Sequence, residues 1–562
     1  MQYKIFLSLF LLAALFNSCN SLKNSASKTA KKDVPFFWEN AQIYFLLTDR
    51  FYNGDSSNDV NFGRTKKTSK LRDFMGGDLR GITQKIEEGY FNDLGVDAIW
   101  FTPIVEQIHG LVDEGTGGTY GFHGYWTKDW TALDPNFGTE DDLRNLVKAA
   151  HRKGIRIMLD VVINHTGPVT EGDPVWPKSW VREEPNCTYK DFETTVTCTL
   201  VDNLPDIKTE SRKAVELPDY LVQKWKAEGR YEQEVTELDA FFERTGLTRT
   251  PTNYIIKWLT DFIRDYGIDA YRVDTVKHTE EEVWEDLRKE AEAAFEEWKT
   301  QNPKAIAILD DQEFYMMGEV YGYGISGGRN YDYGDREVDF FDAFNSLINF
   351  EFKYDADQMD YEKLFTKYEK KLAKELEGKT TVNYLSSHDD GDPYDAARKR
   401  PMETATRLLL SPGSAQTYYG DETARTLIIP GTNGDATLRS FMNWEELKNN
   451  ANREGYRTQD VLAHWQKLGT FRQQHPAIGM GDHERISKSP YTFQRTFKKD
   501  KFEDQVVVAL DLKGQVGEIE VGKVFKEGTF LRDHYSGKQV RVKDGKVEVP
   551  DGADLILLAK DE

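Results

Sequence analysis

The feature that most constrains the fold is a repeating unit of apolar strand, polar loop and amphipathic helix, which begins at Gln42. Hydrophobic periodicity predicts strands and helices in alternation at 42–48, 82–94, 98–102, 139–153, 155–162 and 253–266. Strands that alternate with helices form parallel sheets, and continuous apolar runs indicate strands buried on both faces. A closed eight-stranded barrel and an open doubly wound sheet both fit this pattern. No glycine-rich phosphate loop follows the first strand, which disfavours a nucleotide-binding open sheet.

Two stretches depart from the repeating unit. Between about His165 and Thr250, scattered Pro, Gly, Thr and Trp predict a long insertion after the third strand, which we expect to form a small domain of its own. After about Ile486, short β-rich runs alternate with Gly turns, and this rhythm predicts an antiparallel β-sandwich at the C-terminus.

The first residues predict export. Lys4 followed by the apolar run 5–16 is typical of a signal peptide, which we assign to 1–18. The segment Leu15-Phe-Asn-Ser-Cys19 resembles the lipobox of bacterial lipoproteins, and this resemblance implies a lipidated Cys19; an ordinary secretory peptide cleaved nearby is the alternative. Residues 19–35 then form a flexible tether rich in Ser, Lys, Ala and Asn. We expect an outer-membrane-anchored lipoprotein, on the periplasmic side or the cell surface, that contacts the membrane only through its lipid.

Cysteine use and charge narrow the partners further. Cys187 and Cys198 lie in an irregular Thr-rich segment of an exported chain, where a disulfide can persist, so we predict that they pair. The net charge of −22 argues against nucleic acid and anionic lipid as partners. Aromatic residues make up 13% of the chain, which suits a surface that stacks on sugar rings, although core packing explains most of them.

The stretch 266–278 combines a predicted strand with charged residues at its end. Arg272 and Asp274 are two residues apart, so they share one face of the strand. A neighbouring positive charge lowers the pKa of a carboxyl, and an ionised carboxylate at a strand end can act as a nucleophile. A purely structural Arg–Asp pair is the alternative interpretation of this spacing taken alone.

Three other predicted strands also end in polar clusters. The third strand ends in the segment that contains Asp160, Asn164 and His165, a later one ends in Glu319, and another ends in His388 and Asp389. In a barrel, the C-terminal ends of all parallel strands lie on one face. The carboxyls would therefore converge, and random structural pairing does not explain that recurrence.

Taken in order, these clusters resemble the four signature regions of the α-amylase family, glycoside hydrolase family 13. Further segments typical of the family are Phe122-His-Gly-Tyr-Trp126, Leu204-Pro-Asp-Ile207 and Tyr418-Tyr-Gly-Asp-Glu422, and the resemblance extends from about Gln42 to the end. It implies an α/β fold, a (β/α)8 TIM barrel. The expected division is a barrel at 36–165 and 251–484, an inserted domain at 166–250 and a C-terminal β-sandwich at 485–562.

The same resemblance implies a role for each cluster. Asp274 would be the nucleophile that forms a covalent glycosyl-enzyme, Glu319 the general acid and then the base, and Asp389 a third carboxylate that grips sugar hydroxyls. Retaining enzymes hold the first two carboxyls roughly 5–5.5 Å apart. The residues implied to bind sugar are His123, Tyr125, His165, Arg272, Lys277, His278 and His388.

Two calcium sites are also implied, because carboxylate, amide and carbonyl oxygens suit this hard cation. The first would lie between the barrel and the inserted domain, held by Asn164, Asp206 and the backbone carbonyl of His278. The second resembles a loop of cyclodextrin glucanotransferases; its ligands would be Asn53, Asp55, Asn58, Asp59, Asp78 and the Gly76 carbonyl. A polar turn is the alternative for the second, since turns use the same residue types.

The leading hypothesis is a monomeric, retaining, endo-acting α-amylase that cleaves α-1,4 bonds in starch or maltodextrins. A neopullulanase or cyclomaltodextrinase, a glucanotransferase or an α-glucosidase would use the same machinery. A lipoprotein that binds starch without cutting it is the non-enzyme alternative. The intact set Asp274, Glu319 and Asp389 argues against that alternative.

Overall fold

The computed structural model describes residues 34–562 apart from 114, 515–516, 550–551 and 562. Residues 36–562 form one compact unit. The predicted signal peptide at 1–18, the lipidated Cys19 and almost all of the tether at 19–35 lie outside the described residues. Within the described part of the chain, no helix has the length and apolarity needed to cross a bilayer.

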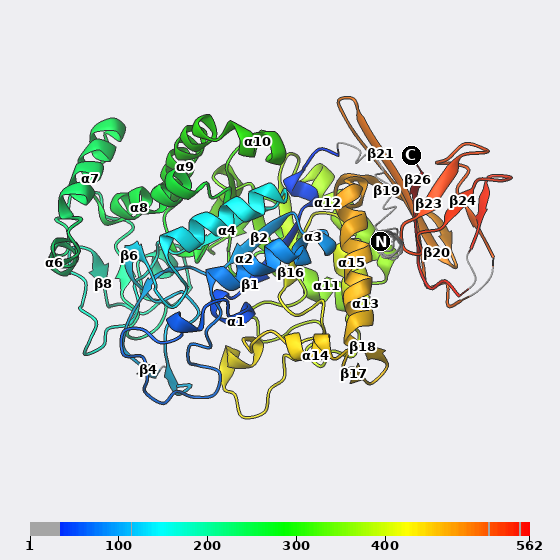
Figure 1. The fold of residues 1–562 in the computed structure, drawn as a ribbon. Coiled ribbons are helices and arrows are strands. Elements are labelled where there is room, and N and C mark those ends of the chain that lie inside the picture. Colours follow the sequence, from blue (N-terminus) through cyan, green and yellow to red (C-terminus); the bar gives the residue numbers. More distant parts are fainter. Residues whose placement is uncertain (1–33, 114, 515–516, 550–551, 562) are drawn as a thin grey trace, which may run out of the picture. The chain divides into compact units, whose positions relative to one another are not determined.

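Eight strands close into a parallel barrel in the order β1-β16-β15-β14-β11-β10-β7-β2 (Figure 1). The strands are β1 (Gln42–Leu46), β2 (Ala98–Phe101), β7 (Arg156–Val161), β10 (Ala270–Val273), β11 (Tyr315–Gly318), β14 (Ser346–Asn349), β15 (Thr380–Asn383) and β16 (Ser414–Tyr418). All of their residues are buried, as the continuous apolar runs in the sequence predict. The closed barrel is therefore confirmed over the open sheet.

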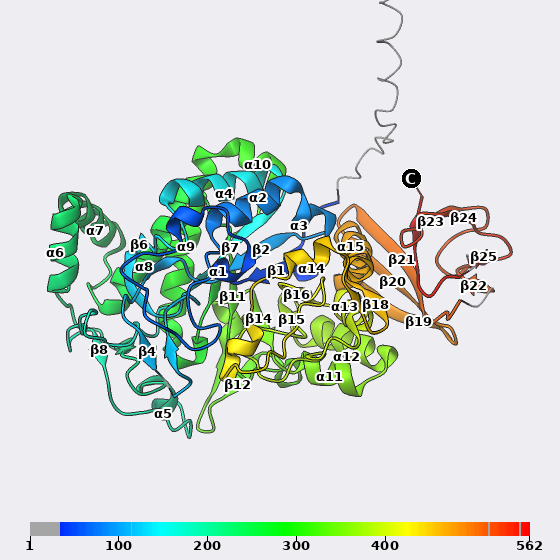
Figure 2. The ribbon, with the colours of Figure 1, turned by 60° about the horizontal axis from the view of Figure 1, so that its bottom comes forward.

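Helices form a layer outside the strands (Figures 1 and 2). They include α2 (Leu79–Glu88), α4 (Glu140–Arg152), α8 (Pro251–Tyr266), α9 (Glu281–Gln301), α12 (Tyr361–Lys374), α13 (Pro401–Leu409) and α15 (Thr458–Gln474). Helix α4 begins with a capping box in which Thr139 and Asp142 satisfy each other's backbone amides. Helix α8 begins with Pro251 after the capping residue Thr250 and ends at Gly267 in the left-handed conformation.

The single helix predicted at 82–94 is wrong in its bounds. Asp78 caps α2, so the helix begins earlier, and it stops at Gly89, which has φ 89°. A separate short helix, α3 (Tyr90–Asp93), follows. A left-handed glycine ends a helix because it has no Cβ to clash, and the apolar period alone does not reveal that break.

The segment between β7 and α8 adds no strand to the barrel. It contains an antiparallel pair, β8 (Val181–Arg182) with β9 (Asp206–Ile207), and the helices α5 (Glu193–Val196), α6 (Asp219–Glu228) and α7 (Tyr231–Thr245). A disulfide joins Cys187 to Cys198, the pair expected from the sequence. The assigned domain boundaries stay predictions.

The C-terminal region is an antiparallel β-structure, as expected. A six-stranded sheet contains β19 (Asp482–Lys488), β20 (Tyr491–Lys499), β21 (Phe502–Leu510), β26 (Ile556–Lys560), β23 (Phe530–Asp533) and β24 (Gln539–Arg541). The two-stranded sheet of β22 (Glu518–Glu520) and β25 (Lys546–Glu548) supplies Ile519 and Val547 to an apolar core shared with Val507, Leu531 and Leu558 of the larger sheet. Alternating side chains on one face of each sheet are therefore buried in this shared core.

Candidate active site

Strand register brings the predicted catalytic residues together at the C-terminal end of the barrel. Arg272 on β10 lies beside Asp160 on β7 and Met317 on β11. Asp274 follows β10 directly, Glu319 follows β11, and the segment after β15 carries His388 and Asp389. The sequence alone predicted this convergence from four separate strand ends.

Arg272 is the central contact of the site. Its guanidinium is almost fully buried, and Nη1 donates to Asp160 Oδ1 at 2.9 Å and to Asp274 Oδ1 at 2.6 Å. Nη2 lies 2.8 Å from Glu319 Oε1. Thr275, in the left-handed conformation at φ 50°, donates its backbone N–H to Glu319 Oε2 at 3.0 Å. The planar guanidinium of Arg272 therefore holds Asp274, the expected nucleophile, at Nη1 and Glu319, the expected acid, at Nη2.

The pKa values of these two carboxyls move in opposite directions. Burial would raise the pKa of Asp274, but the charge and hydrogen bond of Arg272, with His165, hold it below its ordinary value. Burial raises the pKa of Glu319 well above its ordinary value; Arg272 opposes this, while Asp274 and Asp389 add to it. Asp274 is therefore an ionised carboxylate at neutral pH, and Glu319 retains its proton to a higher pH.

Asp160 has a role that the sequence did not assign. Its Oδ2 accepts from Trp100 Nε1 at 3.0 Å and from Tyr125 OH at 2.8 Å, while Oδ1 accepts from Arg272. Trp100 comes from β2 and stacks on Phe45 of β1 at 3.7 Å. Asp160 thus fixes the positions of Arg272 and Tyr125. The motif contained it, but no pattern in the sequence indicated its partners.

The three histidines near these carboxyls are buried, and they are neutral at neutral pH. Burial lowers the pKa of His123, His165 and His388. His388 stacks on Tyr125 with 5.2 Å between ring centres, and His165 Nε2 lies 3.2 Å from the Tyr125 carbonyl. His165 Nδ1 is buried and has no hydrogen-bond partner among the described residues. A sugar hydroxyl would satisfy such a nitrogen.

Asp389 differs from the other two carboxyls. Its side chain is 34% exposed, against 9% for Asp274 and 8% for Glu319. His388 Nδ1 lies 3.6 Å from Asp389 Oδ1. An accessible carboxylate beside two buried ones suits contact with substrate hydroxyls better than covalent chemistry.

Beyond Glu319 lies a group of aromatic residues that the sequence did not single out. Lys277 Nζ donates to the Tyr321 carbonyl at 3.0 Å and to Tyr331 OH at 3.2 Å, and it lies 5.8 Å from the ring centre of Tyr189. Tyr189 and Tyr321 are each 54% exposed. The predicted His278 is nearly buried, and its Nδ1 lies 2.8 Å from the Thr195 carbonyl. We call Lys277, Tyr189, Tyr321 and Tyr331 the tyrosine group.

A second unpredicted feature lies beside His388. Asp435 is held between Arg72, whose Nη2 lies 2.8 Å from Oδ1, and Arg439, whose Nη2 lies 2.5 Å from Oδ2. Arg439 Nε also donates to the His388 carbonyl at 2.9 Å. The Asp435 side chain is 30% exposed, so this fixed carboxylate is available to a ligand. No strand-end motif carries it, because it lies in the loop after β16.

The first predicted calcium set contains a competing cation. Asn164 Nδ2 donates to Asp206 Oδ1 at 2.8 Å, and both residues are buried. Arg182 Nε lies 3.3 Å from Asp206 Oδ2, and its Nη2 contacts Glu210. The Arg182 guanidinium already lies beside the Asp206 carboxylate, where a calcium ion would bind. These residues therefore fit a calcium site incompletely.

The second set fits a cation better. Asn53 Nδ2 lies 2.8 Å from Asp59 Oδ1, and a Cβ added at Gly76 would come within 2.6 Å of both side chains. Asn58 Oδ1 is buried without a hydrogen-bond partner in the described part of the chain. Asp55 instead contacts Ser57 and Arg80, and Asp78 accepts backbone N–H groups of Gly54, Asp55 and Gly81. Asn53, Asn58, Asp59 and Gly76 would therefore hold the ion.

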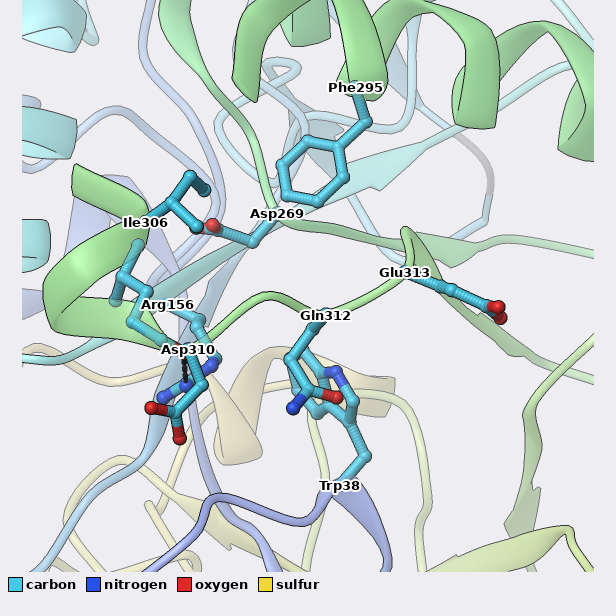
Figure 3. A pocket seen from close by; sticks show the side chains of 9 residues that line it. Trp38, Arg156, Asp269, Phe295, Ile306, Asp310, Gln312 and Glu313 are labelled. Atoms are coloured by element: carbon cyan, nitrogen blue, oxygen red, sulfur yellow. Dashed lines mark hydrogen bonds between the residues drawn. The ribbon is translucent and has the colours of Figure 1, made fainter. Parts of the chain in front are cut away.

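The cavity in Figure 3 lies away from Asp274, Glu319 and Asp389. Trp38 precedes β1, Arg156 begins β7 and Asp269 precedes β10, so they lie at the N-terminal ends of the strands. Its volume of about 10 Å³ is room for roughly one water molecule. It is therefore too small for a sugar.

A closed parallel barrel whose strand ends hold two buried carboxyls with opposed pKa shifts is an arrangement that suits a glycoside hydrolase. Residues 45–481 match the family model described as "Alpha amylase, catalytic domain", and the chain belongs to that family. It is 36% identical over 550 residues to a periplasmic α-amylase of Escherichia coli, covering 87% of this chain and 75% of that protein.

The relatives include an enzyme with a different named activity. A cyclomaltodextrin glucanotransferase of Thermoanaerobacterium thermosulfurigenes is 26% identical over 512 residues, covering 88% of this chain and 63% of that one. Among solved structures, an Anoxybacillus α-amylase is similar with a TM-score of 0.64 and 23% identity, covering 94% of this chain and all of that one. The last likeness concerns the fold alone.

Proposed function

We propose that this chain is a retaining, endo-acting hydrolase of α-1,4-glucosidic bonds in starch and maltodextrins. The observation that carries the proposal is the bridge by Arg272 between Asp274, with a lowered pKa, and Glu319, with a raised pKa. A nucleophile and a general acid need these opposite protonation states at the same pH.

The reaction would proceed in two displacements. Asp274 attacks the anomeric carbon as Glu319 gives its proton to the glycosidic oxygen, so the C–O bond to the leaving sugar breaks and an ester to Asp274 forms. Glu319, now ionised, then takes a proton from water, whose oxygen displaces Asp274. Arg272 keeps Asp274 ionised, and Asp389 would hold ring hydroxyls of the distorted sugar.

Endo action is supported by polar and aromatic groups beyond the reacting carboxyls on two sides. The tyrosine group lies beyond Glu319, and Asp435 lies beyond His388. A glucan that contacts both would extend in both directions from the cleaved bond. The relation to a periplasmic α-amylase agrees with this reading.

Transfer to a second sugar is the main alternative. The exposed rings of Tyr189 and Tyr321 favour it, because rings that stack on a sugar bring an acceptor to the glycosyl-enzyme in competition with water. Relatives described as a glucanotransferase and a cyclomaltodextrinase are 26% and 25% identical to this chain. A starch-binding protein without activity is the non-enzyme alternative.

Product analysis tests the proposal. The protein without residues 1–19 is incubated with amylose, maltoheptaose, pullulan and β-cyclodextrin, with Glu319→Gln beside it. Short maltodextrins from amylose, with little attack on pullulan or cyclodextrin, are expected. Preferred cleavage of cyclodextrin or pullulan indicates a cyclomaltodextrinase or neopullulanase, products longer than maltoheptaose indicate transfer, and bound starch without products contradicts an enzyme.

For location, we propose export and anchoring through lipid on Cys19. The apolar run at 5–16 and the relation to a periplasmic protein support export. Cys19→Ser is expected to move the protein from the membrane fraction to the soluble fraction. An unchanged distribution would favour an ordinary signal peptide.

A further inference from the structure

The loop that the disulfide closes contacts Lys277 and His278 beside the active site. In this loop, Tyr189 is the second residue after Cys187. Tyr189 has φ 55°, a conformation that a tyrosine rarely adopts without support from its surroundings. Its half-exposed ring lies 5.8 Å from Lys277 Nζ and 5.9 Å, edge to face, from the His278 ring.

Other residues of the same loop fasten it to the barrel. The Thr195 carbonyl lies 2.8 Å from Nδ1 of His278, which follows Asp274 in the segment after β10. The Phe192 N–H donates to Asp335 Oδ1 at 2.9 Å, and its ring lies against the Arg336 guanidinium and Tyr333. Tyr333 OH in turn donates to the Lys277 carbonyl at 2.8 Å.

We propose that the Cys187–Cys198 loop is a positioning element for the sugar on the leaving-group side, the disulfide holding Tyr189 in place beside Lys277. This inference rests on the proposed function, in which Glu319 protonates the leaving oxygen. Lys277 lies on that side, because the N–H of its neighbour Val276 donates to the Glu319 carbonyl at 3.0 Å. The covalent link removes conformations in which Tyr189 would lie away from Lys277. Less conformational entropy is therefore lost when a sugar binds. The loop has no contact with Asp274 or Glu319 among the interactions described, so its effect should be confined to substrates with a sugar on that side.

Two substrates separate the two sides of the cleaved bond. Maltoheptaose places sugars on the leaving-group side, whereas maltotriosyl fluoride has only fluoride there. The Cys187→Ser/Cys198→Ser double variant is expected to lose about tenfold in kcat/KM for maltoheptaose, at least fivefold more than its loss for the fluoride. Transfer from the fluoride to added maltose should fall in parallel, relative to hydrolysis.

Tyr189→Ala is expected to show a similar loss on maltoheptaose, and adding it to the double variant should cause little further loss, because both remove the same contact. Lys190→Ala, a change at the exposed neighbouring residue, is the matched control and should behave like the unaltered enzyme. If the double variant does not fold, reduction of the native protein with a phosphine, verified by alkylation of two thiols, replaces it.

Equal losses on both substrates, or none on maltoheptaose, would overturn the inference. Inactivity of the unaltered enzyme on maltoheptaose and on the fluoride would instead contradict the proposed function. The two failures are therefore distinguishable.

Discussion

At the scale of single residues, the chemistry depends on where protons reside. Asp274 and Glu319 are both buried and both touch Arg272, yet their pKa values move apart. The difference arises from contact: Asp274 receives a hydrogen bond and the charge of Arg272 with help from His165, whereas burial and neighbouring carboxyls dominate at Glu319. Identical functional groups thus take different roles through their surroundings.

The pH dependence of kcat/KM follows from these directions. Activity needs Asp274 ionised, so it falls as pH decreases through a pKa below the ordinary 3.8. It also needs Glu319 protonated, so it falls as pH increases through a pKa above the ordinary 4.5. A bell-shaped profile on maltoheptaose is expected. An alkaline limb at or below pH 4.5 would contradict the assignment of Glu319.

Glu319→Gln should separate the two displacements. Loss of the general acid is expected to lower kcat/KM on maltoheptaose by about 10³-fold. Maltosyl fluoride needs no proton for its leaving group, so this variant should still form the ester to Asp274 and then accumulate it. Mass spectrometry of the peptide containing Asp274 measures this. A modified peptide elsewhere, or none, would contradict the covalent mechanism.

The sequence predicts some residues of the site but not all of them. The carboxyls, Arg272 and the histidines were predictable because strand ends carry them in a fixed order. Tyr189 and Asp435 were not, because they lie in loops whose positions depend on long-range contacts such as Arg72 with Asp435. Asp160 lay within a recognised motif, but its contact with Trp100 depends on the pairing of β2 with β7.

At the scale of elements, the strands differ in how clearly the sequence marks them. β2, β7 and β10 are apolar runs and were predictable. β14 and β16 were not, since Ser-Leu-Ile-Asn has polar residues at both ends and Ser-Ala-Gln-Thr-Tyr is mostly polar. Two of the buried polar residues of β16 have partners: Ser414 Oγ donates to the Trp38 carbonyl and Thr417 Oγ1 accepts from Gln42. Barrel closure supplies those partners, so local hydropathy does not reveal these strands.

The loop after β16 should affect binding more than chemistry. Asp435→Ala is expected to raise KM for maltoheptaose about tenfold with less than a threefold change in kcat, because a hydrogen bond to a charged group contributes about 1.5–3 kcal/mol. Glu445→Ala, a highly exposed change in α14 (Trp444–Lys448), is the control. A fall in kcat with KM unchanged would place Asp435 in the chemical step instead.

At the scale of the whole molecule, cations should contribute to stability. Asn53, Asp59 and Gly76 lie together, and Asn58 Oδ1 is buried without a hydrogen-bond partner among the described residues. A calcium ion bound only to the folded chain would stabilise it by about 2.7 kcal/mol at a concentration of 100 Kd. Excess chelator is therefore expected to lower the Tm, and Asn58→Ala to reduce that effect. A melting curve that chelator leaves unchanged would count against both predicted sites.

One guanidinium, that of Arg272, touches three buried carboxyls: Asp160, Asp274 and Glu319. A single positive charge does not compensate three negative ones away from water, so at least one proton stays in the resting site. Burial raises the pKa of Glu319 well above its ordinary value, so the proposed cycle starts with this acid protonated. That proton leaves with the first sugar, and the water that displaces Asp274 supplies its replacement to Glu319, so each completed cycle restores the protonated acid.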